Sequence, residues 1–512
     1  MNHHLVLLPV IIPLTGAALA LLLGGRGLLG GRRLQRGQGL QGGQGLQAGW
    51  ALGVMLTSLA SSLWLLVQVS RSGQPVVFQA GGWPAPFGIS LVGDLLSATL
   101  VVMSQAVLAA GIIYALGSQE QAVRYPAFYP LFLTLATGLT GAMLTGGLFN
   151  LFVFAELLVF SGTILTAISD DRYGTEAAFK YFYMSLLASA FLLLAVGSLY
   201  ISYGTLNMAD LARRIPANPG APLLPVAIAM LLATFMIKSA VFPFHFWQPD
   251  FHTASPTAVS AMLSSVVVKL GVYGFLRMTS LLFVEQAPAI RALLVGLGVV
   301  GVVYGGLGAV GTHNAKRMLA YSTLAQVGFI LVAIGWGDRL ALAAAIIFTF
   351  NHSLIKAAML MLAGAVASRA PVKTAAFGVV TGLGKSMPAT GALFLVGGLA
   401  LAGIPPTNGF ISKMVLFRSG IEGGQYASLA AVGVASILTL VYVTRAFQRI
   451  WWQPPLEGGK AKPTGDSLLA PALLIVAVLA LGLWAAPLVE LAQATADWLG
   501  SPAGYIQAVL GG

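Results

Sequence analysis

Long apolar runs recur along this chain of 512 residues, and they limit its possible folds more than any other feature. Each run is close to the roughly 20 residues that a helix needs to cross the hydrocarbon core of a bilayer. Only 8% of the residues are charged and 57% are hydrophobic, whereas a soluble domain carries about 25% charged residues. The runs are continuous, unlike the alternating segments of a β-barrel. The sequence therefore predicts an all-α polytopic protein embedded in a lipid bilayer.

Fourteen segments satisfy this criterion, and each predicts one transmembrane helix. They lie near residues 3–24, 48–70, 88–116, 126–145, 147–169, 176–203, 222–246, 255–281, 287–311, 317–336, 338–365, 387–417, 424–448 and 467–489. Between the first two, residues 25–47 are rich in Gly and Gln, which is typical of a loop. Residues 452–466 form a second polar segment.

The basic residues predict how these helices are oriented. No Lys or Arg precedes the first apolar run, and a basic cluster at 26–36 follows it. This order favours an uncleaved first helix with its N-terminus outside. Loops that would then lie inside hold 15 basic residues, whereas outside loops and outer helix ends hold 7, including Arg277. We therefore expect a multi-pass protein of a bacterial-type inner membrane with both termini outside.

Several classes of function are excluded by what the sequence lacks. It contains no cysteine, which excludes disulfides, cysteine-ligated clusters and thiol catalysis. The formal net charge is +12, but the basic residues form no stripe interleaved with aromatic residues, so no nucleic acid is expected as a partner. The motifs of nucleotide-binding loops, dinucleotide folds and nucleophile elbows are not found. We expect no cofactor and no redox or hydrolytic site in this chain.

Ionisable residues inside the apolar runs are the strongest functional signal. Five lysines and no arginine lie there, and one carboxylate lies deeper than any other: Lys180, Lys238, Lys269, Lys356, Lys413 and Glu156. Such a group costs at least about 2.5–3.5 kcal/mol at mid-bilayer and marks a functional site by default. The alternative is a side chain that reaches the interface or pairs between helices. That alternative applies most to Lys180, which lies near the end of its run.

Two apolar runs are interrupted by proline. Pro243 follows Lys238 by five residues, and Pro405 and Pro406 lie shortly before Lys413. A proline bends a helix and frees a carbonyl group, and freed backbone at membrane depth is tolerated only inside protein or along a wet cavity. Paired interruptions are typical of transporters built from internal repeats, where they mark the ion path. Two simple packing kinks are the alternative.

Three histidines lie near these features. His352 and Lys356 are one helical turn apart on one face, and histidine can relay protons near neutral pH. His245 and His252 flank the stretch that contains Asp250, a spacing that could resemble a metal site. No third convergent ligand is evident in the sequence, so we expect no metal. We predict instead a loop that shapes a cytoplasmic entrance for protons.

Taken together, these stretches resemble the antiporter-like membrane subunits shared by Mrp-type cation/proton antiporters, respiratory complex I and membrane-bound hydrogenases. The matching stretches are 149–156, 238–249, 256–260, 269–273, 351–356 and 403–413. The most specific is the run Lys-x₄-Pro-x-His-x-Trp-x-Pro that begins at Lys238. The resemblance covers about residues 90–420. Within the family, the stretch 203–212 and the short tail look most like the D subunit of the Mrp-type antiporter.

The resemblance implies two inverted five-helix repeats, helices 4–8 and 9–13, in which helices 7 and 12 are broken. The chain would then divide into residues 1–116, 126–281, 287–448 and 467–512. The resemblance also implies a proton route, to which Lys356 is added beside His352. This route consists of Glu156, Lys238, Lys269, His352, Lys356 and Lys413, with Lys180, His245 and His252 in secondary positions.

The expected function is proton translocation within a multi-subunit sodium/proton antiporter, with other membrane subunits as partners and protons and Na⁺ as transported ions. We hypothesise that Glu156 and Lys238 form an ion pair that opens and closes. Two unit charges about 4 Å apart attract by about 4 kcal/mol at an effective dielectric constant of about 20. Three alternatives stay open: a proton-pumping subunit of complex I or of a hydrogenase-like complex, a scaffold that carries unused charges, and a solitary solute carrier.

Overall fold

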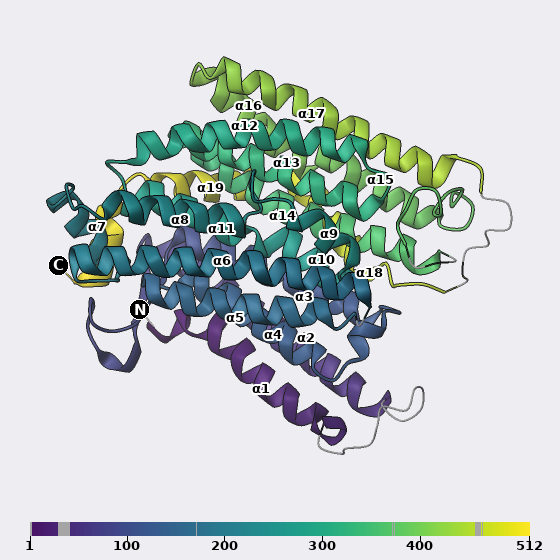
Figure 1. Cartoon of the computed structure of the whole chain (residues 1–512), viewed down its shortest axis with the longest axis horizontal. Helices are drawn as coiled ribbons and strands as arrows, with labels where there is room; N and C mark the ends of the chain where they lie inside the picture. The colour runs from purple at the N-terminus through teal and green to yellow at the C-terminus, as the bar shows by residue number, and fades with distance from the viewer. Residues whose placement is uncertain are drawn as a thin grey trace.

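The computed structural model describes residues 3–28, 41–169, 171–370, 374–455 and 464–511, together with Val372 and Lys462. In these residues most helices run roughly along the long axis of the molecule, side by side (Figure 1). The strands are confined to one antiparallel hairpin in the described part of the chain, β1 (Val76–Gln79) with β2 (Ser90–Gly93). The predicted all-α architecture is confirmed.

The fourteen predicted segments correspond one for one to spanning units in the described part of the chain. Nine are helices long and apolar enough to cross a bilayer, one is a bent pair of helices, and four are shorter apolar helices. Both chain ends lie on the same side of the molecule (Figure 1), as an even number of spans requires. Five basic residues used to predict the orientation lie outside the described residues: Arg32, Arg33, Arg36, Lys373 and Lys460.

The N-terminal part contains three spanning helices and short 3-10 turns. These elements are η1 (His3–Val6), α1 (Leu8–Leu28), α2 (Gln41–Ser72), η2 (Ala80–Gly82), α3 (Leu95–Leu116) and η3 (Gln121–Arg124). The predicted loop 25–47 is therefore wrong at both ends, where α1 and α2 extend into it. Gln is a good helix former and each Gly costs only about 1 kcal/mol relative to Ala, so an apolar helix can continue into such a segment. The middle of that segment, residues 29–40, lies outside the described residues.

The first predicted repeat contains one broken span and one span with π-helical turns. Its elements are α4 (Phe128–Leu144), α5 (Leu148–Ala167), α6 (Arg172–Tyr203), α7 (Met208–Ala217), α8 (Leu224–Lys238), α9 (Trp247–Ala254), α10 (Thr257–Met262), η4 (Leu263–Val267), α11 (Lys269–Arg277) and η5 (Met278–Leu282). The short helix α7 was not predicted. The expected loop around His252 is also wrong, because residues 247–254 form α9.

The second predicted repeat contains the other broken span, which separates α15 from α16. Its elements are α12 (Ala287–Gly311), α13 (Ala315–Trp336), α14 (Arg339–Arg369), α15 (Pro388–Ala402), α16 (Asn408–Glu422), α17 (Tyr426–Phe447) and the π-helical turn η6 (Gln448–Trp452). Both predicted breaks are thus confirmed. The division of the chain into four parts stays a prediction.

The C-terminal part differs from the single straight helix that was predicted. It contains α18 (Leu469–Leu483), α19 (Ala486–Leu499) and α20 (Pro502–Leu510). The helices α18 and α19 are bent by 78° relative to each other. The predicted last span, 467–489, therefore covers α18 and only the start of α19.

Short polar residues fix the beginnings of several spanning helices. Asp94 accepts a hydrogen bond from the backbone N–H of Ser97 at the start of α3, and the Ser97 hydroxyl accepts one from the backbone N–H of Asp94, which completes a capping box. Asn314 and Asp338 cap α13 and α14 in the same way, each through its side-chain oxygen. Such caps satisfy N–H groups that a helix leaves unpaired at its first turn. They set where each apolar helix begins and so fix the depth of its interior residues.

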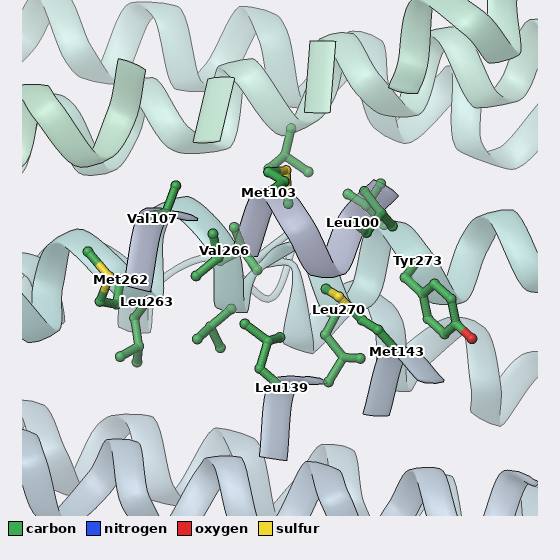
Figure 2. Close-up of a cluster of buried hydrophobic side chains, with 14 of the residues drawn as sticks. Leu100, Met103, Val107, Leu139, Met143, Met262, Leu263, Val266, Leu270 and Tyr273 are labelled. Carbon is green, nitrogen blue, oxygen red and sulfur yellow. The ribbon is translucent and has the colours of Figure 1, made fainter. Parts of the chain in front are cut away.

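The span that begins at α10 lies in the centre of the molecule. Every residue in its most apolar window is buried. On one side it packs against α3 and α4 through large apolar side chains (Figure 2). These include Met262, Leu263, Val266 and Leu270 of the span, Leu100, Met103 and Val107 of α3, and Leu139 and Met143 of α4. This packing places Lys269, at the start of α11, in the interior.

Candidate functional site

The predicted pair Glu156 and Lys238 is separated in this structure. Glu156, in the middle of α5, accepts a hydrogen bond from the Ser189 hydroxyl of α6. Lys238 is the last residue of α8 and is only 7% exposed. Its Nζ atom is buried and has no hydrogen-bond partner among the described residues. The ion pair is therefore open, and its closing stays a prediction.

The end of α8 lies directly against the span that carries Lys269. The Ser239 hydroxyl, next to Lys238, donates a hydrogen bond to the Val268 carbonyl at 3.1 Å. Gly271 makes this approach possible, because a Cβ atom there would lie 2.0 Å from Ser239 Oγ and 2.5 Å from the Phe235 carbonyl oxygen. The backbone segments that carry Lys238 and Lys269 are thus in contact.

Lys269 and His352 are in direct contact at the centre of the molecule. Lys269 Nζ lies 2.8 Å from His352 Nδ1, and the two residues are 0% and 2% exposed. The other ring nitrogen of His352, Nε2, is buried without a partner in the described part of the chain. Only Val268 separates Lys269 from the π-helical turn η4, and such turns are frequently found at functional sites. This contact joins the first predicted repeat to the second.

Lys356 lies one helical turn beyond His352 on α14 but binds a different helix. Its Nζ donates to the Leu319 carbonyl at 3.0 Å and to the Ser322 hydroxyl at 2.8 Å, both on α13. The Ser322 hydroxyl is in turn 2.7 Å from the hydroxyl of Tyr442 on α17. Sequence reasoning missed Ser322 and Tyr442, since isolated hydroxyl residues in apolar runs carry no spacing signal.

Lys413 bridges the two pieces of the second broken span. It lies in α16, and its Nζ donates a hydrogen bond of 2.8 Å to the carbonyl of Ala402, the last residue of α15. The ammonium also lies 5.3 Å from the centre of the Phe329 ring, a favourable cation–π arrangement. A cavity of about 570 Å³ adjoins Lys413 and is also lined by Arg418 and Glu422. Lys413 is therefore a deep lysine that lines a cavity.

An amide pair holds this break against α14. Asn351 Nδ2 donates to the Asn408 carbonyl at 2.9 Å and to the Ser412 hydroxyl at 2.7 Å. Asn408 Nδ2 donates back to Asn351 Oδ1 at 3.1 Å. The prolines of the break, Pro405 and Pro406, lie just before α16. The residue before His352 therefore positions the helix that carries Lys413.

The secondary residues occupy separate places. Lys180 pairs with Glu176 at 2.6 Å and with Asp250 at 2.8 Å, and Asp250 also binds Arg317 at 2.9 Å. All four side chains are at least one third exposed. This is the helix-to-helix pairing that was the alternative interpretation of Lys180. Lys180 therefore differs from the deep lysines, because its side chain is partly exposed and theirs are buried.

His245 and His252 also have different surroundings. The His245 ring, two residues after Pro243, packs on Phe242 and Tyr304, with centres 5.6 and 4.7 Å apart. His252 is fully buried on α9, and its Nδ1 lies 3.0 Å from the Ser260 hydroxyl. In the described residues, no three His, Asp, Glu or Cys side chains are grouped as metal ligands.

A buried ion pair at the opposite end of α11 was missed by sequence reasoning. Two nitrogens of Arg277 bind the two carboxylate oxygens of Asp94 at 2.7 and 2.8 Å, and the Trp498 indole donates to Asp94 at 2.9 Å. Asp94 and Arg277 are 0% and 4% exposed. The usable signal was the capping box formed with Ser97, which marks Asp94 as the cap immediately before a helix.

The described geometry is a row of buried and half-buried ionisable side chains across several helices, and the sequence that carries it matches a known family. The family model described as "NADH:quinone oxidoreductase/Mrp antiporter, TM" matches residues 145–439. The chain belongs to this family. The match covers both broken spans and each residue of the row from Glu156 to Lys413.

Individual members of the NADH:quinone oxidoreductase/Mrp antiporter family are similar over most of the chain. The D subunit of the Na⁺/H⁺ antiporter of Alkalihalophilus pseudofirmus is 32% identical over 88% of this chain and 92% of its own length. The N subunit of the NADH-quinone oxidoreductase of Desulforudis audaxviator is 35% identical over 84% of this chain and 88% of its own length. Both branches of the family are thus represented at similar identity.

A solved structure of the family has the same fold. A chain of the Mrp complex from Dietzia superposes with a TM-score of 0.88 at 29% identity, and all of both chains is covered. The predicted resemblance and fold class are confirmed by this agreement. These relatives are subunits of larger membrane assemblies by their names.

Proposed function

We propose that this chain is the proton-translocating subunit of a multi-subunit monovalent cation/proton antiporter. The observation that carries the proposal is the contact of 2.8 Å between Lys269 and His352. It brings two buried, titratable side chains from the two predicted repeats within hydrogen-bond distance. A proton can cross such a contact directly, because an ammonium donates to a neutral imidazole. The names of the antiporter D subunits support the choice of ions.

The proposed path runs from Glu156 and Lys238 through Lys269, His352 and Lys356 to Lys413. Burial penalises a charged amine and a nearby carboxylate stabilises it, so closing the Glu156–Lys238 pair would hold a proton and opening it would release one. The pair energy of about 4 kcal/mol equals the work of moving one charge through about 180 mV. Where side chains of the path do not touch, ordered water has to carry the proton.

The second candidate is a proton-pumping membrane subunit of an NADH:quinone oxidoreductase or hydrogenase-like complex. The observation in its favour is the 35% identity to the N subunit from Desulforudis audaxviator. Purification of the native complex separates the two candidates. Small membrane subunits alone support the antiporter, whereas flavin or iron–sulfur subunits support the redox complex.

Transport by vesicles tests the proposal directly. The assembled complex is expressed with wild-type chain or with Glu156→Ala, Lys238→Ala or Lys413→Ala, and Na⁺-dependent proton flux is measured per assembled complex. We expect each of these changes to lower the flux by at least about 100-fold, since each removes a proton-carrying group. Lys385→Ala is the matched control, because Lys385 is exposed in the segment before α15. Flux that survives Lys238→Ala would favour a scaffold that carries unused charges.

We also propose that the assembly lies in an inner membrane of bacterial type with both termini of this chain outside. The basic residues of the loops support this orientation through the positive-inside rule. Partners in that setting are the other membrane subunits and the lipid bilayer.

A further inference from the structure

We propose that the hydroxyls of Ser322 and Tyr442 form a proton branch that connects Lys356 with the side of the molecule where α13 begins and α17 ends. This inference rests on the proposed function and adds two residues to its path. Its basis is an unbroken chain of hydrogen bonds across three helices. Lys356 Nζ lies 2.8 Å from Ser322 Oγ, and Ser322 Oγ lies 2.7 Å from the Tyr442 hydroxyl.

All three side chains are sealed from solvent. Lys356 and Ser322 are 0% exposed and Tyr442 is 1% exposed. Each hydroxyl can accept one hydrogen bond while donating another, which is the property that a proton relay needs. The second partner of Lys356, the Leu319 carbonyl, can only accept. Any proton that reaches Lys356 from α13 therefore has to come through Ser322.

The chain of groups lies in the half of the bundle where α13 begins and the span that contains α17 ends. At a rise of about 1.5 Å per residue, Lys356 lies about 20 Å before the end of α14 at Arg369. Ser322 lies about 10 Å after the start of α13 at Ala315, and Tyr442 lies about 15 Å before Trp452, where η6 ends the span that α17 begins. The three groups lie at a similar depth, because contacts of 2.8 and 2.7 Å join them. The end of the bundle at which α13 begins is the cytoplasmic one in the proposed orientation.

Polar groups continue beyond Tyr442 to the helix end. Thr444 and Arg445 are half-buried on the last turn of α17. Arg445 Nη1 donates to the Val310 carbonyl at 2.8 Å and so ties this turn to the end of α12. The end of this span at Trp452 is about three helical turns from Tyr442, so water beside these polar side chains has to complete the branch.

The proton balance of one transfer is simple. Water gives a proton to the Tyr442 oxygen while Tyr442 gives its own to Ser322, and Ser322 gives its own to the free amine of Lys356. The water is left as hydroxide, Lys356 becomes an ammonium, and each hydroxyl again holds one proton. The hydroxyls must then rotate before the next proton follows. No covalent bond other than O–H and N–H bonds changes.

A purely structural role of this cluster makes a different prediction. If the hydrogen bonds served only to satisfy Lys356, loss of the Tyr442 hydroxyl would matter little, because Lys356 keeps both the Ser322 hydroxyl and the Leu319 carbonyl. The ring of Phe fills the same space as that of Tyr. Tyr442→Phe therefore separates a relay from a support.

The experiment measures Na⁺-dependent proton flux in vesicles that contain the assembled complex, normalised to the amount assembled. The variants are Tyr442→Phe, Ser322→Ala and Ser322→Thr, with Tyr321→Phe as control, a half-buried neighbour of Ser322 on the same helix. We expect Tyr442→Phe and Ser322→Ala to be about 100-fold slower, at the low end of what a positioned proton donor contributes. Ser322→Thr restores the hydroxyl and should transport like wild type, as should Tyr321→Phe.

Two results would overturn the branch while leaving the proposed function in place. One is wild-type flux in Tyr442→Phe. The other is a Ser322→Thr variant as slow as Ser322→Ala, because the hydroxyl would then not be the group that matters. A wild-type complex without Na⁺-dependent proton flux would instead overturn the proposed function itself.

Discussion

Two kinds of buried cation can be distinguished among the described residues by the groups that bind them. Arg277 is held by a carboxylate, Asp94, with two short contacts. Lys269, Lys356 and Lys413 bind only an imidazole, a hydroxyl or backbone carbonyls in the described residues. Arginine keeps its proton at any physiological pH, whereas a buried lysine can lose it. Lysine stands where the charge is proposed to change and arginine where it is fixed.

Lys269→Arg tests this distinction at one residue. The variant keeps the positive charge and much of the side-chain volume but cannot release a proton to His352. We expect Na⁺-dependent proton flux to fall by at least about 100-fold, while the amount of assembled complex stays near wild type. Flux is measured in vesicles and assembly by purification through a partner subunit. Substantial flux in Lys269→Arg would show that the amine does not pass protons.

A loop carboxylate gives a second prediction, which concerns pH. Asp466 accepts hydrogen bonds from the Tyr114 hydroxyl at 2.5 Å and from the backbone of Gln119 at 2.7 Å. Burial raises the pKa of Asp466 above its ordinary value of 3.8. The folded state therefore binds a proton more tightly than the unfolded state, and stability falls as pH rises from about that value through the raised pKa.

The variant Asp466→Asn removes this titration but keeps an oxygen that accepts from Tyr114. We compare the melting temperatures of the wild-type complex and of Asp466→Asn at each pH. We expect the wild-type value to fall relative to that of the variant as the pH is raised above about 4, because Asp466 begins to ionise there in the unfolded chain. Melting of the purified complex is followed across pH by fluorescence. A difference between the two proteins that rises with pH would contradict the burial argument.

The sequence was sufficient to find the deep lysines but not their partners. Lys269 and Lys413 are visible because a charge in an apolar run is costly and rare. The contacts of Lys269 with His352 and of Lys356 with Ser322 join helices that are far apart in the sequence, and no local pattern encodes them. Asp94 was missed for a different reason, since it lies at the edge of its run and resembles an ordinary helix cap.

At the scale of elements, the two broken spans place an amine in the same position. Lys238 is the last residue of α8, and Lys413 reaches back from α16 to bind the last carbonyl of α15. The C-terminal end of a helix carries partial negative charge and stabilises a nearby cation. A cation can thus be held at each break without a carboxylate, by an interaction weaker than an ion pair. Such weak support suits a group that has to give up its proton.

The bend between α18 and α19 shows where prediction of the elements was incomplete. Run length alone predicts one straight helix there. Gly482 lies against the second broken span, and a Cβ atom there would be 2.1 Å from the Pro406 carbonyl oxygen. Pro487 then stands in the first turn of α19, a position that favours proline. Both residues were visible in the sequence, but only the packing against α16 shows why the helix turns.

The Asp94–Arg277 pair links three elements and predicts a stability effect. It connects the start of α3 with the end of α11, and Trp498 adds α19. Arg277→Met leaves Asp94 buried without its partner, which should cost about 3–5 kcal/mol. The double variant Asp94→Asn with Arg277→Met leaves no buried charge and keeps a cap, so it should be more stable than the single variant. Thermal melting of the purified complex compares them, and the reverse order would refute this view of the pair.

At the scale of the whole molecule, the direction of every helix follows from one fact, the side on which the chain begins. An odd number of spans separates the exposed Gln74, after α2, from the exposed Lys385, before α15. These two positions must therefore face opposite sides of the membrane. The loop charges put Gln74 outside and Lys385 inside. The branch through Tyr442 depends on this assignment, because it ends on the same side as Lys385.

The absence of cysteine from the sequence makes this orientation directly testable. Gln74→Cys and Lys385→Cys each introduce one thiol into the chain, and the wild-type chain is the unlabelled control. In right-side-out vesicles, a maleimide that cannot cross the membrane should label Gln74→Cys and leave Lys385→Cys unlabelled, and inverted vesicles should give the opposite pattern. Labelling is read on this chain after the subunits are separated, so thiols of the partner chains do not interfere. The reversed pattern would place both termini inside and would move the proposed branch to the outer side. Labelling of both variants from one side would contradict the odd number of spans between them.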